Sequence, residues 1–235
     1  MLLELVLSYR YSHLMCGLYS FRKPADEARA LFKYLEQPIF PPREYVTPGS
    51  PIAIVRTGPD HQRHFELVRW GFVPSWAKEI QPRPLINARS ETVYEKPSFK
   101  NAIRRRRCLF PADGFYEWEG EVPGKKRPYF IHRPDNGLFA FGGIWEHWQS
   151  ADGSELETAA MITTDPNLLI ATIHDRSPVV IHPKDFDRWL DGAEENVRDL
   201  LKSPPDDYFT MEPTIIVRNA PPSKPTPPKS QLDLI

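Results

Sequence analysis

The sequence of 235 residues has few cysteines and almost no net charge. Its two cysteines, Cys16 and Cys108, cannot build a disulfide framework, which favours a reducing compartment and hence a cytoplasmic location. A formal net charge of −1 excludes a uniformly basic nucleic-acid-binding protein, although a local basic groove stays compatible with it. The leading segment, residues 1–14, is too short and too polar at its end to span a bilayer, so we expect no membrane partner.

Several sequence motifs of common enzyme classes are also missing. There is no glycine-rich phosphate loop, no internal repeat, no Gly-x-Ser-x-Gly elbow and no serine-histidine-aspartate order. One His-x-x-His pair occurs, at His61 and His64, but it lies in a predicted turn and has neither the glutamate nor the third ligand of a zinc site. We therefore expect neither a metal nor a cofactor.

Proline and aromatic residues, in contrast, are abundant. The 26 prolines, 6 tryptophans and 13 phenylalanines favour many short strands and ordered loops over a helical bundle. Alternating and apolar runs predict strands over 18–21, 52–55, 64–70, 108–111, 115–119, 128–133, 138–148 and 157–164. Helices are predicted from Pro24 and over 98–106, 166–171, 182–190 and 194–202. We expect a leader at 1–14, one domain over 15–219 and a proline-rich tail at 220–235.

A second candidate chain start lies at Met15-Cys16-Gly17. If translation begins at Met15 and the methionine is removed, Cys16 carries a free α-amine beside its thiol. Such a 1,2-aminothiol captures aldehydes, because the amine forms an imine and the sulfur then closes a five-membered thiazolidine. Residues 1–14 lack a basic n-region and a small-residue cleavage site, so they do not look like a secretion signal. A mis-set start, a propeptide and a frayed strand are the open interpretations, and we favour the first.

Further candidates combine aromatic and charged side chains. Tryptophans such as Trp70 and Trp76, near a turn, either pack in a core or lid or form a platform on which bases stack. The arginine run 104–107 is either a solvated face or a surface along a phosphate backbone. Glu117, flanked by aromatics on a strand, is an edge charge or a proton donor in an apolar pocket that raises its pKa. His174, before an aspartate and an arginine, is structural or catalytic.

Six motifs occur in one order: Met15-Cys16-Gly17, Trp70-Gly71 through Pro74 and Trp76, 86–91, 96–99, 107–118, and His174-Asp175-Arg176 with Pro178. Together they resemble the SOS response-associated peptidase (SRAP) family, also called abasic-site processing proteins. The resemblance extends from Met15 to about Leu190. It implies an α+β fold, a single domain with a curved, barrel-like antiparallel sheet flanked by short helices.

The resemblance also implies a function in the DNA damage response: binding of single-stranded DNA and covalent crosslinking to its abasic sites, whose open-chain sugar is an aldehyde. Four positions match the family's catalytic residues: Cys16 as the nucleophile, Asn87 as the group that positions its amine, Glu117 as the acid/base for sugar-ring opening, and His174 as a proton shuttle that assists reversal. Four more match its DNA-binding surface: Arg89, Arg176, Trp70 and Trp76. We expect a monomer associated with the nucleoid.

Two other functions stay open. In a thiol (auto)peptidase, Cys16 would attack a peptide bond with His174 as the base. A non-catalytic single-strand-binding module would apply if the leader persists. The chain also departs from the family pattern. Leu18 stands where the family has arginine, the segment that starts at Tyr45 replaces an Asn-x-Ala-Pro motif, and Ser177 replaces methionine. We therefore expect the affinity or the rate to differ from those of the family, while the reaction class is kept.

Overall fold

The computed structural model describes residues 17–216 except 39, 121, 123, 124, 192 and 194–196. The predicted leader at 1–14, the candidate start at Met15-Cys16 and the predicted tail at 220–235 lie outside the described residues. Within the described part, no helix is long and apolar enough to cross a membrane.

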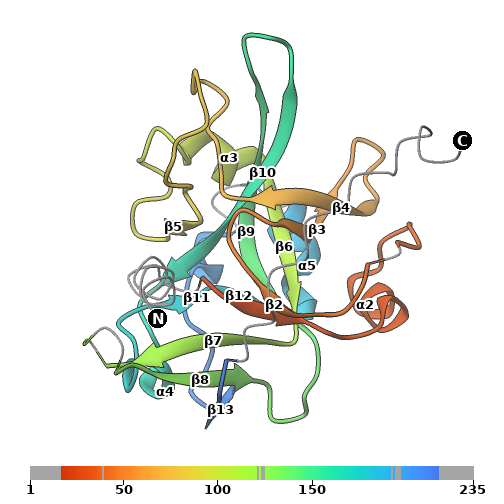
Figure 1. The fold of residues 1–235 in the computed structure, drawn as a ribbon. Coiled ribbons are helices and arrows are strands. Elements are labelled where there is room, and N and C mark those ends of the chain that lie inside the picture. Colours follow the sequence, from red (N-terminus) through yellow and green to blue (C-terminus); the bar gives the residue numbers. More distant parts are fainter. Residues whose placement is uncertain are drawn as a thin grey trace, which may run out of the picture.

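The larger of two sheets closes on itself. Its strand order is β11-β10-β4-β3-β6-β9-β12, and an additional β9–β10 pairing joins the ends of the path β10-β4-β3-β6-β9 into a ring. β5 pairs with β10 outside this ring (Figure 1). The strands are β3 (Pro51–Thr57), β4 (Arg63–Trp70), β5 (Asn87–Arg89), β6 (Arg107–Ala112), β9 (Phe139–Gln149), β10 (Glu155–Thr164), β11 (Ser177–Pro178) and β12 (Val180–Ile181). The predicted barrel-like sheet is therefore confirmed.

A glycine in β9 allows the strands of this ring to approach closely. Gly143 pairs with Cys108 on β6 and with Met161 on β10. A Cβ at this position would lie 2.2 Å from the ring of Phe110 and 3.1 Å from the carbonyl oxygen of Ala160. Because β6 is buried along its whole length, the phenylalanine ring has no space into which it could move.

The smaller sheet has the order β13-β8-β7-β1-β2 and lies below the ring in Figure 1. Its strands are β1 (Tyr19–Phe21), β2 (Arg43–Val46), β7 (Gly114–Glu119), β8 (Arg127–His132) and β13 (Thr210–Pro213). Asp113 occupies the corner where the chain leaves β6 and enters β7. Its buried carboxylate accepts hydrogen bonds from the Ser20 hydroxyl and from the backbone N–H of Arg22 (2.9 Å), which fixes β1 to this corner.

Short helices lie around the sheets, as predicted. They are α2 (Ala25–Phe32), α3 (Lys100–Arg105), α4 (Leu168–Ala171) and α5 (Phe186–Asp191), with 3-10 turns η1 (Pro183–Asp185) and η3 (Arg198–Leu200). Phe32 stacks on Phe186 with ring centroids 5.3 Å apart, so α2 and α5 pack together. The predicted helix over 194–202 is wrong in its described part, where 197–202 form only the single turn η3.

The α+β class is confirmed, and so is the antiparallel character of most strand pairs. The exceptions are β4 and β5, which both run parallel to β10. No strand was predicted over residues 84–91, whereas the structure places Asn87–Arg89 in β5. Three residues that pair with a distant strand leave too short a pattern to recognise in the sequence.

Candidate functional site

The candidate site begins with a buried carboxylate in the middle of the smaller sheet. Glu117 lies on β7, which pairs with β8 on one side and β1 on the other, and only 2% of the residue is exposed. This placement excludes the interpretation of Glu117 as an edge charge, because β7 is a central strand. Nε2 of His174 lies 3.9 Å from Oε2 of Glu117, so the structure brings two of the predicted catalytic residues together.

The pairing of β1 with β7 directs the start of the described chain toward this carboxylate. Tyr19 pairs with Phe115, and the backbone N–H of Tyr116 donates to the carbonyl oxygen of Leu18 at 2.9 Å. Continuing the antiparallel register by one residue sets Gly17 beside Glu117. Cys16 lies outside the described residues, but it is bonded directly to Gly17.

His174 is held at the end of α4 rather than at the start of a strand. Its backbone N–H donates to the carbonyl oxygen of Ile170 at 2.9 Å. Its Nδ1 accepts a hydrogen bond from the backbone N–H of Arg176 at 3.0 Å. Because Nδ1 is the acceptor, a neutral ring carries its proton on Nε2, the nitrogen that faces Glu117. Oδ1 of the exposed Asp175 lies 3.1 Å from Nδ1.

Arg176 makes protein contacts with both of its terminal guanidinium nitrogens. The residue is 8% exposed, and it forms a bidentate pair with Glu91 at 2.6 and 2.8 Å. It also donates to Oδ1 of Asp165 at 3.0 Å and to the carbonyl oxygen of Thr163 at 2.9 Å. The hydrogen bonds that Glu91 accepts from Arg176 lower the pKa of Glu91 and keep it ionised. The predicted contact of Arg176 with DNA is not the arrangement seen here, where its guanidinium binds the protein.

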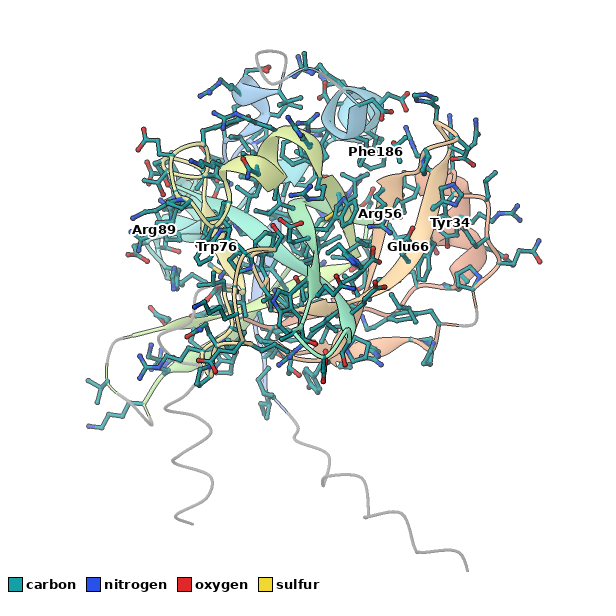
Figure 2. The ribbon with its side chains drawn as sticks, turned by 90° about the horizontal axis from the view of Figure 1, so that it is seen from above. Tyr34, Arg56, Glu66, Trp76, Arg89 and Phe186 are labelled. Carbon is teal, nitrogen blue, oxygen red and sulfur yellow. The ribbon has the colours of Figure 1, made fainter. Side chains whose placement is uncertain are left out.

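β5 carries two further predicted site residues, Asn87 and Arg89, on one short strand. Asn87 pairs with Met161 of β10 and is half-buried, whereas Arg89 pairs with Thr163 and is exposed. Trp76, in the loop that precedes β5, is 63% exposed. Figure 2 shows Trp76 and Arg89 toward one side of the molecule, away from Tyr34. An exposed indole and an exposed guanidinium are the groups that stack on bases and contact phosphates.

The prediction that Trp70 belongs to an aromatic DNA-binding floor is wrong. Trp70 is 0% exposed, and its ring meets that of Tyr19 edge-on at 5.3 Å. Its indole N–H donates to the carbonyl oxygen of Ile86 at 3.0 Å. Trp70 is therefore a core residue that holds β1 and the start of β5 together. The other interpretation of the tryptophan pair, core packing, applies to Trp70.

The arginine run and the second cysteine are largely structural. Arg107 is buried and donates to the carbonyl oxygens of Trp189 and, at 2.8 Å, Ile103. Arg106 pairs with Glu146 at 2.7 Å. Cys108 is fully buried, and burial raises the pKa of its thiol far above the ordinary range, so it is a poor nucleophile.

Two of the three departures from the family pattern, Leu18 and Tyr45, are neighbours in space. Leu18 and Tyr45 belong to one small apolar cluster with Tyr116 and Phe130. The rings of Tyr45 and Tyr116 lie 5.4 Å apart. The substitutions therefore extend an apolar surface on the face of β7 opposite Glu117, because side chains alternate along a strand.

The His-x-x-His segment is surrounded by carboxylates. Nδ1 of His64 lies 2.6 Å from Oε1 of Glu36, and Nε2 lies 2.9 Å from Oδ1 of Asp60. These hydrogen bonds, to Asp60 first and then to Glu36, raise the pKa of His64. Over the residues that the structure describes, no cluster of three or more histidine, cysteine or acidic side chains could hold a metal ion.

The arrangement of β1, β5, β7 and His174 can be compared with known proteins. The family model for "SOS response associated peptidase (SRAP)" matches residues 15–216. The chain belongs to the SRAP family. The fold agrees with a solved structure from Bacteroides thetaiotaomicron, with a TM-score of 0.77 and 26% sequence identity over 87% of this chain and 93% of that one.

Curated relatives of this SRAP chain carry a functional name. The chain is 37% identical over 180 residues to the "abasic site processing protein YoqW" of Bacillus subtilis, and the match covers 75% of this chain and 80% of that protein. It is 35% identical over 160 residues to the "abasic site processing protein HMCES" of Gallus gallus, covering 57% of this chain. The match spans 47% of the chicken protein, so the similarity covers about half of that longer chain.

Proposed function

We propose that this SRAP protein processes abasic sites in single-stranded DNA by forming a covalent thiazolidine crosslink through an amino-terminal Cys16. The names of its relatives support the substrate class. The start of the family match at residue 15 supports a mature chain that begins at Cys16 after loss of Met15.

One observation carries the proposal: the β1–β7 register places Gly17 beside Glu117, with Nε2 of His174 3.9 Å from that carboxylate. An α-amine and thiol on the residue before Gly17 would then lie within reach of both proton-transfer groups. General acid–base catalysis requires this proximity between the reacting atoms and a positioned acid or base.

The chemistry divides into balanced steps. Glu117, protonated, gives its proton to the ring oxygen O4′ of the abasic sugar as the C1′–O4′ bond breaks. The resulting carboxylate takes the proton of the 1′-hydroxyl, which leaves the C1′ aldehyde and a protonated Glu117. The Cys16 amine adds to C1′, and one water leaves to form the imine. The thiol then adds to the same carbon as its proton passes to the imine nitrogen, which closes the five-membered ring. His174, whose Nε2–H faces Glu117, stabilises the Glu117 carboxylate between the two proton transfers of sugar-ring opening.

The DNA-binding surface in this proposal consists of Trp76 and Arg89. Trp76 would stack on a base, and Arg89 would contact a phosphate next to the abasic sugar. Asn87 lies on the same strand as Arg89 and would accept a hydrogen bond from the Cys16 amine. The imine also permits strand cleavage by β-elimination, so we expect weak lyase activity when ring closure is blocked.

The test compares three forms of the chain: the full chain, a chain initiated at Met15, and the Met15-initiated chain with Cys16→Ala. Each is incubated with a single-stranded oligonucleotide that carries one abasic site and is then resolved on a denaturing gel. We expect a shifted covalent band only when Cys16 is the first residue. Equal bands from all three forms would refute the proposed nucleophile.

A second candidate is autoproteolysis, which the pairing of His174 with a carboxylate also suits, because a thiol nucleophile needs an oriented base. In that case the full chain would release residues 1–15, and Cys16→Ala would block the release. Intact mass of the full chain over time decides between the two. Monomeric state stays a prediction.

A further inference from the structure

Glu91 is the strongest partner of Arg176, a buried arginine next to the site. Both of its carboxylate oxygens accept from Arg176, at 2.6 and 2.8 Å, which is the bidentate geometry of the strongest arginine–carboxylate pairs. Asp165 offers one oxygen at 3.0 Å and is 85% exposed at its side chain, compared with 42% for Glu91. Glu91 therefore determines where the guanidinium lies, and Asp165 contributes less.

The same arginine fixes the histidine ring through its backbone. The N–H of Arg176 donates to Nδ1 of His174 at 3.0 Å, and this bond directs the ring proton to Nε2, toward Glu117. Next in the chain, β11 pairs Ser177 with Thr164 of β10. The side chain of Arg176 and β11 thus anchor the short segment that carries His174 at two points.

Glu91 also connects this segment to β5. It follows Asn87 by four residues and Arg89 by two. The carbonyl oxygen of Thr163 accepts from both the backbone N–H of Ser90 (2.8 Å) and the guanidinium of Arg176 (2.9 Å). The Glu91 carboxylate therefore links the strand that carries Asn87 to the segment that carries His174.

We infer that Glu91 is a positioning residue, which acts through Arg176 to hold His174 with its Nε2–H directed at Glu117. The inference rests on the proposed function for its catalytic consequence, but the orientation of the ring can be measured without it. Its chemistry differs from that of the proposed catalytic residues, because Glu91 exchanges no proton with the sugar.

The kinetic test uses Glu91→Gln, which keeps the shape and one acceptor, and Asp165→Asn as the matched control. At saturating abasic oligonucleotide we expect Glu91→Gln to slow crosslinking by about 10- to 100-fold, because misplacing a catalytic group by about 1 Å costs up to about 100-fold. Asp165→Asn should change the rate by no more than about 2-fold, since only one exposed contact is lost. Binding to an undamaged oligonucleotide should stay unchanged.

A double substitution separates positioning from general stability. In a His174→Gln background, Glu91→Gln should cause no further slowing, because residues that act through one another are not additive. Equal slowing in both backgrounds would overturn the inference. Tighter DNA binding by Glu91→Gln at an unchanged crosslinking rate would also overturn it, and would mean that Glu91 withholds Arg176 from DNA.

Ring ¹⁵N spectra of the full chain test the inference even if the wild-type protein forms no crosslink. The chain has 7 histidines, and the His174 signals are those that vanish in His174→Gln. The wild type should show Nε2–H as the dominant neutral tautomer, and Glu91→Gln should show averaging of both tautomers. Identical His174 signals in the wild type and in Glu91→Gln would refute the positioning role. If the His174 signals differ between the two proteins but the wild type forms no crosslink, only the proposed function is refuted.

Discussion

Replacing Glu117 with glutamine removes proton transfer at the site and keeps the shape of the side chain. The group is buried in the middle of β7, so no bulk water stands beside it to take over its role. A positioned general acid contributes about 10²- to 10⁴-fold to a rate. Because the glutamine amide still donates a hydrogen bond at this position, we expect the lower end, about 100-fold or roughly 2.7 kcal/mol.

The assay for Glu117→Gln is a quenched time course on denaturing gels, with the abasic oligonucleotide in excess over the protein. Anisotropy with an undamaged oligonucleotide of the same sequence measures binding. We expect it to stay within about 2-fold of wild type, since undamaged DNA has no abasic sugar for Glu117 to protonate and affinity comes mainly from phosphate contacts. If binding and crosslinking fall together, or if crosslinking keeps its wild-type rate, the acid/base assignment is wrong.

Four further predictions concern the surface and the core. Trp76→Ala should weaken DNA binding by about 1–3 kcal/mol, the value of one stacked base. Arg89→Ala should reduce the slope of log affinity against log salt concentration by about 0.7. Titrations at several salt concentrations measure both effects, and an unchanged slope for Arg89→Ala would exclude a phosphate contact. Gly143→Ala should destabilise the fold by at least about 1–3 kcal/mol by forcing the Phe110 ring aside, measured by urea unfolding. His64→Gln should lower the melting temperature more near pH 6 than near pH 9. The pKa of His64 is raised in the folded protein, so the stabilisation from its charged ring is complete below about pH 6.5. This stabilisation is lost as the pH rises through the folded-state pKa.

The fold was predictable where side-chain patterns repeat over enough residues. The alternation over 64–70 and the apolar run at 108–111 correspond to β4 and β6. β5 and β11 were missed because two or three residues carry no period, and their strand character comes from pairing with β10. The helix predicted over 194–202 failed in its described part, where local propensity gave way to the 3-10 turn Arg198–Leu200.

The candidate site was predictable as a set of residue types and less so as a geometry. The sequence left two interpretations of Glu117 open, and burial on a central strand excludes the edge charge. It offered two states for Trp70 as well, and the family pattern favoured the wrong one because a motif does not report which side of a strand faces the core. The role of Arg176 depends on Glu91, a partner 85 residues away in the chain, which no local pattern could assign.

The central claim concerns which atoms join the protein to the sugar, and the mass of the crosslinked product tests it most directly. The Met15-initiated chain is incubated with the abasic oligonucleotide, treated with borohydride, digested and sequenced by mass spectrometry. We predict a mass equal to protein plus oligonucleotide minus one water, no added hydrogen from the borohydride, and attachment at the peptide that begins with Cys16. Attachment at a lysine, or a borohydride-reduced imine as the only product, would contradict a thiazolidine formed by this chain.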